Sequence, residues 1–188
     1  MFGKSQEKTK QQTQKKVIYG AACNVRHQTG AYRKRICRVG LYSASGSAAE
    51  PVCLPKDPDF VKTSGRGYGH MYGAEFDGNY FASNSANQDV PFAVCRVKQA
   101  SSVIMIPGKN WCVTGWNMEY NGYLASNDHS NAAAGSFVCI AIQPEYINGG
   151  SSWNGGSKLF YDVVAKCGSL RCPPYKQDYP LTCVVCSK

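Results

Sequence analysis

Four cysteines lie in two close pairs within the last 22 residues, Cys167 with Cys172 and Cys183 with Cys186. Their spacing, Cys-x4-Cys, ten residues, Cys-x2-Cys, is similar to a four-cysteine zinc ribbon. Cys183-Val-Val-Cys186 alone is similar to a dithiol redox motif. Disulfides that staple a fold are the third possibility. The pairs do not distinguish these chemistries by themselves, so the elements that carry them have to be considered.

The composition is that of a folded protein from an oxidising compartment. The chain has 188 residues, 43% hydrophobic and 12% aromatic, which is enough for a core. Its ten cysteines are an even number and favour secretion, because cytosolic thiols stay reduced. No run approaches the ~18 apolar residues of a membrane span, and the first residues lack the apolar core of a signal peptide. We therefore expect a mature or trimmed extracellular protein with no membrane span.

The net charge of +9 is confined to the N-terminal segment. Residues 1–38 hold ten Lys and Arg residues against one acid, whereas residues 39–188 hold eleven basic and eleven acidic residues. A neutral body with a basic arm is more typical of an assembly strap or a solvated tail than of a nucleic-acid binder, so we expect no nucleic-acid partner.

An internal repeat organises the chain. "VCLPKDPDF" (52–60) and "VCIAIQPEY" (138–146) match at an offset of 86, "AVC" ending at Cys95 matches "VVC" ending at Cys186 at an offset of 91, and Cys23 falls opposite Cys112 at an offset of 89. Four such matches in the same order, including "GLYSAS" with "GYLASN", indicate a duplication. The predicted division is an arm at 1–16, a first repeat at 17–98 and a second repeat at 99–188.

Both repeats have the character of short strands. Segments rich in β-branched and aromatic residues alternate with Gly, Asn and Ser clusters, and none keeps a helical period. The expected fold is mainly β, with two tandem disulfide-stapled repeats of about 80–90 residues and long loops at 77–90, 125–135 and 147–157. Predicted strands are "KKVIYGAA", "YRKRICRVGLYS", "PFAVCRVK", "SSVIMIP", "SFVCIAI", "KLFYDVVAK" and "PLTCVVCS".

The segments "VPFAVCRV", "VIMIPGKNWCVTGWNMEYNGYL", "FVC", "KCGSLRCPPY" and "LTCVVCSK" couple cysteine order with Gly-Trp-x-x-x-Tyr-x-Gly-Tyr and Cys-x-Val-Cys. In this they resemble the C-terminal domain of sponge and other invertebrate short-chain collagens. More distantly the chain is similar to the non-collagenous C-terminal domain of type IV collagens, which consists of two tandem β-rich halves. The resemblance covers about 17–188 and is densest from Val90 onward.

The resemblance implies a disulfide pattern. Carried over to the second half, it pairs Cys112 with Cys186, Cys139 with Cys183, and Cys167 with Cys172. The first half departs from the pattern, because Phe92 stands where the family has the partner of Cys53. We expect the extra Cys37 to replace that partner, and Cys23 to keep Cys95. A long loop such as that closed by Cys112–Cys186 contributes roughly 4 kcal/mol through chain entropy.

No catalytic, cofactor or metal site is expected. Hydrolase and phosphate-loop motifs are absent, and Asp128-His129 is better explained as a solvated loop than as a metal site. Trp111, Trp116 and Trp153 suggest a sugar-binding surface, although aromatics in a small β core more often serve packing.

The leading hypothesis is a secreted, non-enzymatic structural protein whose copies self-associate into an extracellular fibril or matrix. The alternative is a lectin-like module that binds extracellular glycans. The polar arm has nothing to bury, so we expect it to pair with the sheet edge of a neighbouring copy while Val17, Ile18 and Tyr19 enter the sheet of their own body. The arm residues expected to touch the neighbour are Lys4, Lys8, Lys10, Lys15 and Lys16.

Overall fold

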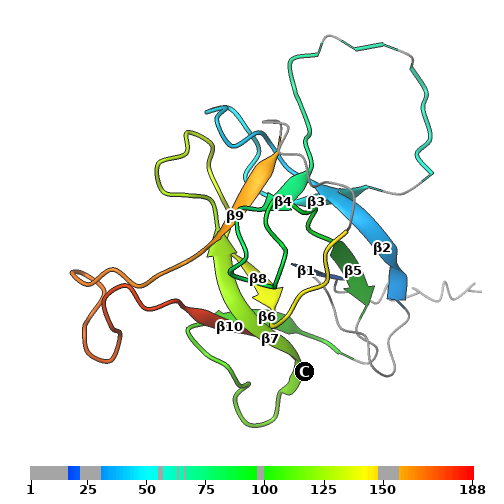
Figure 1. The fold of residues 1–188 in the computed structure, drawn as a ribbon. Helices are drawn as coiled ribbons and strands as arrows, with labels where there is room; N and C mark the ends of the chain where they lie inside the picture. The colour runs from blue at the N-terminus through cyan, green and yellow to red at the C-terminus, as the bar shows by residue number, and fades with distance from the viewer. Residues whose placement is uncertain are drawn as a thin grey trace, which may run out of the picture.

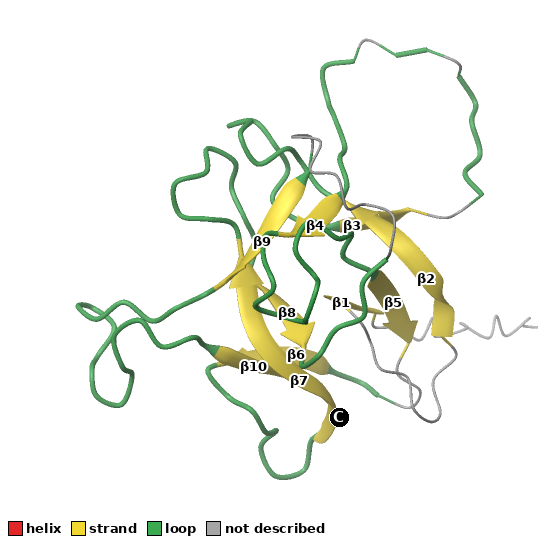
Figure 2. Ribbon diagram, viewed as in Figure 1, coloured by secondary structure: helices red, strands yellow, loops and turns green. Residues whose placement is uncertain are grey.

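The structure is a computed structural model that describes residues 17–21, 31–54, 57–62, 64–65, 67–96, 100–147 and 157–188. For residues 17–21, 31–38, 53 and 93–96 it describes the backbone alone. The described residues contain strands and loops and no helix, so the protein is mainly β, as the sequence predicts (Figure 2). Accordingly, no helix suited to crossing a membrane occurs in these ranges.

Ten strands form the described fold, five from each half of the chain (Figure 1). The loops after β3 and after β9 extend away from the body. The strands are β1 (Val17–Ala21), β2 (Ala31–Arg38), β3 (Val52–Leu54), β4 (Ala74–Phe76), β5 (Phe92–Arg96), β6 (Val103–Pro107), β7 (Asn117–Ser126), β8 (Val138–Ala141), β9 (Lys158–Asp162) and β10 (Thr182–Ser187).

The two halves share one pattern of strand pairing. In the first half, β5 lies antiparallel between β1 and β2, and β2 pairs antiparallel with β3. In the second half, β10 lies antiparallel between β6 and β7, and β7 pairs antiparallel with β8. Cys53 and Cys139 lie on corresponding strands, β3 and β8, and so do Cys95 and Cys186, on β5 and β10. A duplicated unit would give this pattern; the duplication itself stays a prediction.

The halves are joined into one body rather than two. The strand order β3-β2-β5-β1-β8-β7-β10-β6 runs through both of them, and β1 meets β8 in parallel at Ala21 and Ile140. A second parallel contact joins β4 to β9. The main hydrophobic cluster also mixes the halves, with Phe92 packed against Phe160 at a ring-centroid distance of 5.8 Å. Neither half could bury these side chains alone.

The longest strand, β7, is one that propensity did not predict. Its sequence, "NMEYNGYLAS", contains Asn and Gly, which are depleted in strands. Gly122 has a steric role there, because a Cβ added to it would lie 1.7 Å from the Ile140 carbonyl oxygen. The close approach of β8 therefore requires glycine at this position.

Two of the three expected loops can be compared with the structure over their full length. Residues 77–90 contain no strand, and most of 125–135 is loop, although β7 extends to Ser126. Most of the expected loop at 147–157 lies outside the described residues. The short strands β3 and β4 were not predicted, since three residues are too few to show a period.

Candidate functional site

Disulfides staple the second half of the molecule. They join Cys112 to Cys186, Cys139 to Cys183, and Cys167 to Cys172, the same three pairs that the family resemblance implies. All four terminal cysteines are therefore used in bridges, and the zinc-ribbon and dithiol alternatives do not hold. Cys139 and Cys183 lie in the second hydrophobic cluster beside Tyr120 and Leu124.

The first-half bridges are described only in part. The β2–β3 ladder places Cys37 directly opposite Cys53, which is the backbone placement that the predicted replacement bridge needs. Cys95 lies on β5 opposite Ile18 of β1, whereas Cys23 lies outside the described residues. The Cys37–Cys53 and Cys23–Cys95 bridges stay predictions.

The strand order leaves β6 at one end of the sheet and β3 at the other. β6 occupies in the second half the place that β1 has in the first half. β1 has a strand on each side, β5 and β8, whereas β6 pairs with β10 alone among the described strands. Within the described part of the chain the other side of β6 is therefore an open edge, with backbone groups available to a further strand.

Exposed apolar side chains occur on β6 and on the neighbouring part of the sheet. Ile104 of β6 and Met118 of β7 both lie opposite Cys186 of β10, so the three share one face. The Cys112–Cys186 bridge ties the 111–113 segment to β10, and Trp111 and Val113 on either side of Cys112 are 70% and 56% exposed. Ile104 is 38% exposed and Met118 42%. We call Ile104, Trp111, Val113 and Met118 the edge patch.

At the other end of the order, β3 also exposes Val52 and Leu54. Exposed apolar strand edges are surfaces to which a further strand can add. The arm residues Lys4, Lys8, Lys10, Lys15 and Lys16 lie outside the described residues, while Val17, Ile18 and Tyr19 belong to β1 within the sheet.

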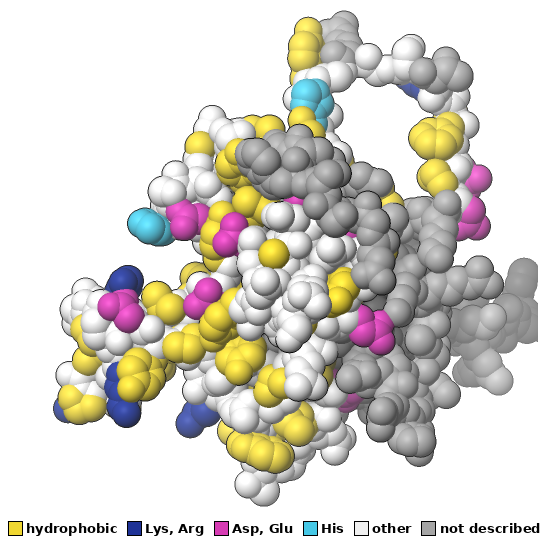
Figure 3. Space-filling view, viewed as in Figure 1, with side chains coloured by type: hydrophobic (Ala, Val, Ile, Leu, Met, Phe, Trp, Pro, Cys, Tyr) yellow, Lys and Arg dark blue, Asp and Glu magenta, His cyan; other side chains and the backbone are white. Residues whose placement is uncertain are grey.

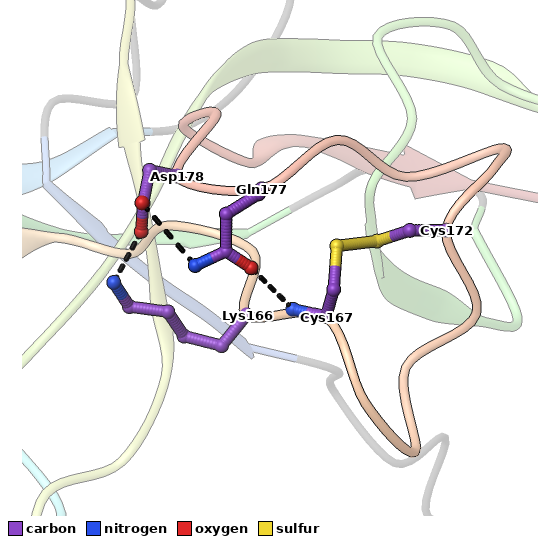
Figure 4. Close-up of a disulfide and its surroundings, with 5 residues drawn as sticks. All are labelled: Lys166, Cys167, Cys172, Gln177 and Asp178. Atoms are coloured by element: carbon purple, nitrogen blue, oxygen red, sulfur yellow. Dashed lines mark hydrogen bonds and ion pairs between the residues drawn. A yellow bond between two sulfur atoms is a disulfide. The ribbon is translucent and has the colours of Figure 1, made fainter.

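The loop between β9 and β10 is held by several cross-connections (Figure 4). Besides the Cys167–Cys172 bridge, the Cys167 amide donates to Gln177 Oε1 at 2.8 Å, and Lys166 pairs with Asp178. The hydrogen bond from Lys166 lowers the pKa of Asp178. The Ala165 amide also donates to the Tyr179 carbonyl at 2.9 Å. These connections hold the backbone of the loop in one conformation, and with it the positions of the exposed side chains.

A buried polar group lies where β4 meets β9. Glu75 accepts a 2.5 Å hydrogen bond from Ser157 through Oε1, and its Oε2 has no hydrogen-bond partner. Lys158, 1% exposed, donates to the Ala134 carbonyl at 3.4 Å. Burial lowers the pKa of the Lys158 amine to about 8. Their positions between packed strands indicate a structural role.

Asp128 and His129, weighed above as a metal site, form a turn. The Asp128 carboxylate accepts from the amide of Ser130 at 2.8 Å and from its hydroxyl, and these bonds lower the pKa of Asp128. His129 Nδ1 is 3.7 Å from Asp128 Oδ1. In the described ranges no three His, Cys, Asp or Glu residues gather as a metal site would require. Trp116 is half-buried, and Trp153 lies outside the described residues.

No protein-family model, curated protein or solved structure matches this chain.

Proposed function

We propose that the protein is a secreted, non-enzymatic structural module whose copies self-associate into an extracellular fibril or matrix. The observation that carries this proposal is the open edge of β6 with the edge patch beside it. The three disulfides are consistent with an extracellular protein.

The occupant of the β6 edge is the N-terminal arm of a neighbouring copy. Strand addition gains backbone hydrogen bonds whatever the side chains are, so a polar arm of Lys and Gln suits this mode. An arm of 16 residues spans roughly 50 Å when extended, more than the width of a body of this size. It therefore reaches a second molecule readily.

The contact is head-to-tail. Each copy donates the segment before β1 and accepts at β6, and these two surfaces differ. Heterologous contacts of this kind close into a ring or continue as a helical filament. The edge patch adds the apolar contact, with Trp111 as its largest exposed side chain.

Electron microscopy of the purified full chain tests the proposal, with filaments or rings as the expected result. Deletion of residues 1–16 and, separately, Ile104→Lys on β6 should each abolish them. The first removes the donor, and the second replaces an apolar contact of the edge patch by a positive charge beside an arm that is itself rich in lysine. Val61→Lys, in the loop after β3, is the matched control. Peptide mapping of the disulfides shows that each variant is folded. Assemblies that survive both changes would overturn the proposal.

A further inference from the structure

A groove of about 440 Å³ lies between the end of β6 and the loop that precedes β10. One wall consists of Pro107, Gly108 and Lys109, and the other includes Tyr175, Lys176 and Tyr179. The walls face each other closely, since a Cβ added at Gly108 would lie 3.5 Å from the Tyr175 hydroxyl. The edge patch is not part of its lining, and Pro107 is the one residue of β6 that is.

The groove is fixed before any ligand binds. The Gly108 amide donates to the Thr182 carbonyl at 2.7 Å, which ties one wall to the base of the other. The loop that carries the tyrosines is held by the Cys167–Cys172 bridge and by the bonds of Gln177 and Asp178 (Figure 4). A ligand therefore need not order the loop, which lowers the entropic cost of binding.

The groove is cationic. Lys109 and Lys176 are its charged lining residues, and no acidic residue appears among the described residues that line it. Asp178, the carboxylate nearest in sequence, is engaged by Lys166 and Gln177. Figure 3 shows Lys and Arg side chains beside hydrophobic and acidic ones on this projecting part of the surface.

The groove also offers aromatic faces. Tyr175 and Tyr179 are 38% and 58% exposed, and Lys176 Nζ lies 5.1 Å from the centre of the Tyr179 ring. Rings of this kind contact the C–H faces of sugars, while lysines pair with sulfate or carboxylate groups. We propose that this groove binds an acidic saccharide, one that carries sulfate or uronic-acid groups.

A short groove favours a saccharide over a nucleic acid, because proteins that hold single strands use an extended basic channel with successive stacking positions. The disulfides agree with an extracellular setting, in which acidic saccharides are accessible ligands. Such binding is a second function beside self-association, at a separate surface.

Isothermal titration calorimetry of the full chain with a heparin-derived hexasaccharide tests this inference, with trigalacturonic acid as the carboxylate probe. At least one of the two should bind, and neutral cellohexaose should bind at least about tenfold more weakly. Tyr179→Ala and Lys176→Gln should each weaken binding about tenfold. Tyr68→Ala and Lys62→Gln, exposed residues of another loop, are the matched controls and should leave the affinity unchanged.

Three results would overturn the inference. The first is that neither acidic probe binds. The second is that Lys62→Gln weakens binding as much as Lys176→Gln while Tyr179→Ala has no effect, which would indicate non-specific charge attraction. The third is that a thymidine oligonucleotide of equal charge binds as tightly and depends on the same residues. Sedimentation of Tyr179→Ala should match that of the wild type, which separates this site from self-association.

Discussion

At the residue scale, burial of the charged Lys158 amine where β4 meets β9 lowers the free energy of unfolding. The side chain is buried with its amine near the Ala134 carbonyl, and burial lowers its pKa from 10.5 to about 8. The charged amine is thus less stable in the folded protein than in the unfolded chain. Below pH 8 the folded protein carries this cost in full, and the cost disappears as pH rises towards 10.5.

Replacement of Lys158 by Met should therefore stabilise the protein at pH 7 by about 1–2 kcal/mol. The gain is smaller than the roughly 3 kcal/mol that the pKa shift represents, because the hydrogen bond to Ala134 is lost as well. Urea denaturation should show the advantage of the variant shrinking between pH 8 and pH 10.5. An advantage that is absent at pH 7, or constant across that range, would contradict this reasoning.

A second residue-scale prediction concerns Cys37 and Cys53, which lie opposite each other in the β2–β3 ladder. Non-reducing peptide mapping should recover their two peptides joined. The Cys37→Ser, Cys53→Ser double variant should lose about 2–3 kcal/mol of stability, because the closed loop is short. A free thiol at Cys37, or a bridge from Cys53 to another cysteine, would refute the replacement bridge.

At the element scale, β7 depends on Gly122. A Cβ there would lie 1.7 Å from the Ile140 oxygen, so β8 would have to move and the β7–β8 ladder would be disrupted. We expect Gly122→Ala to cost about 3 kcal/mol or more in thermal or urea unfolding. Gly78→Ala, where an added Cβ has open space, is the matched control. Equal stability of the two variants would show that the close approach is not needed.

The same strand shows the limit of sequence-based prediction. β1, β2, β5, β6, β8, β9 and β10 were predicted because β-branched and aromatic residues cluster in them. β7 was missed because Gly122 is required by the approach of β8 and Asn121 by its hydrogen bond to Asn110, tertiary contacts that local propensity does not contain. The edge patch was not predicted either, since exposure of Trp111 depends on which strand ends the sheet.

The disulfide pairs of the second half came from the family resemblance rather than from spacing.

The groove lined by Tyr175 and Tyr179 was not predicted from the sequence, for a similar reason. Lys109 and Lys176 are far apart in the sequence and meet because β6 and β10 are neighbours. The sequence does contain one sign of this groove, the Pro-Tyr-Lys run between Cys172 and Cys183, which indicates an exposed loop held by disulfides. A single run of this kind does not reveal the opposite wall.

At the scale of the whole molecule, the account depends on two different surfaces of each copy, the arm as donor and β6 as acceptor. Loss of either should stop assembly without unfolding the body, since Ile104 is exposed and belongs to neither hydrophobic cluster, and the deletion ends before β1. Deletion of residues 1–16 removes the donor and keeps the acceptor, whereas Ile104→Lys keeps the arm and blocks the edge. The two variants are therefore complementary.

Sedimentation velocity of these two variants, alone and in an equimolar mixture, tests the central claim most directly. Each variant alone should sediment as a monomer. The mixture should form a dimer with one copy of each, because the arm of Ile104→Lys can still enter the intact β6 edge of the arm-deleted chain. A mixture that remains monomeric, or an arm-deleted protein that polymerises alone, would contradict arm exchange at β6.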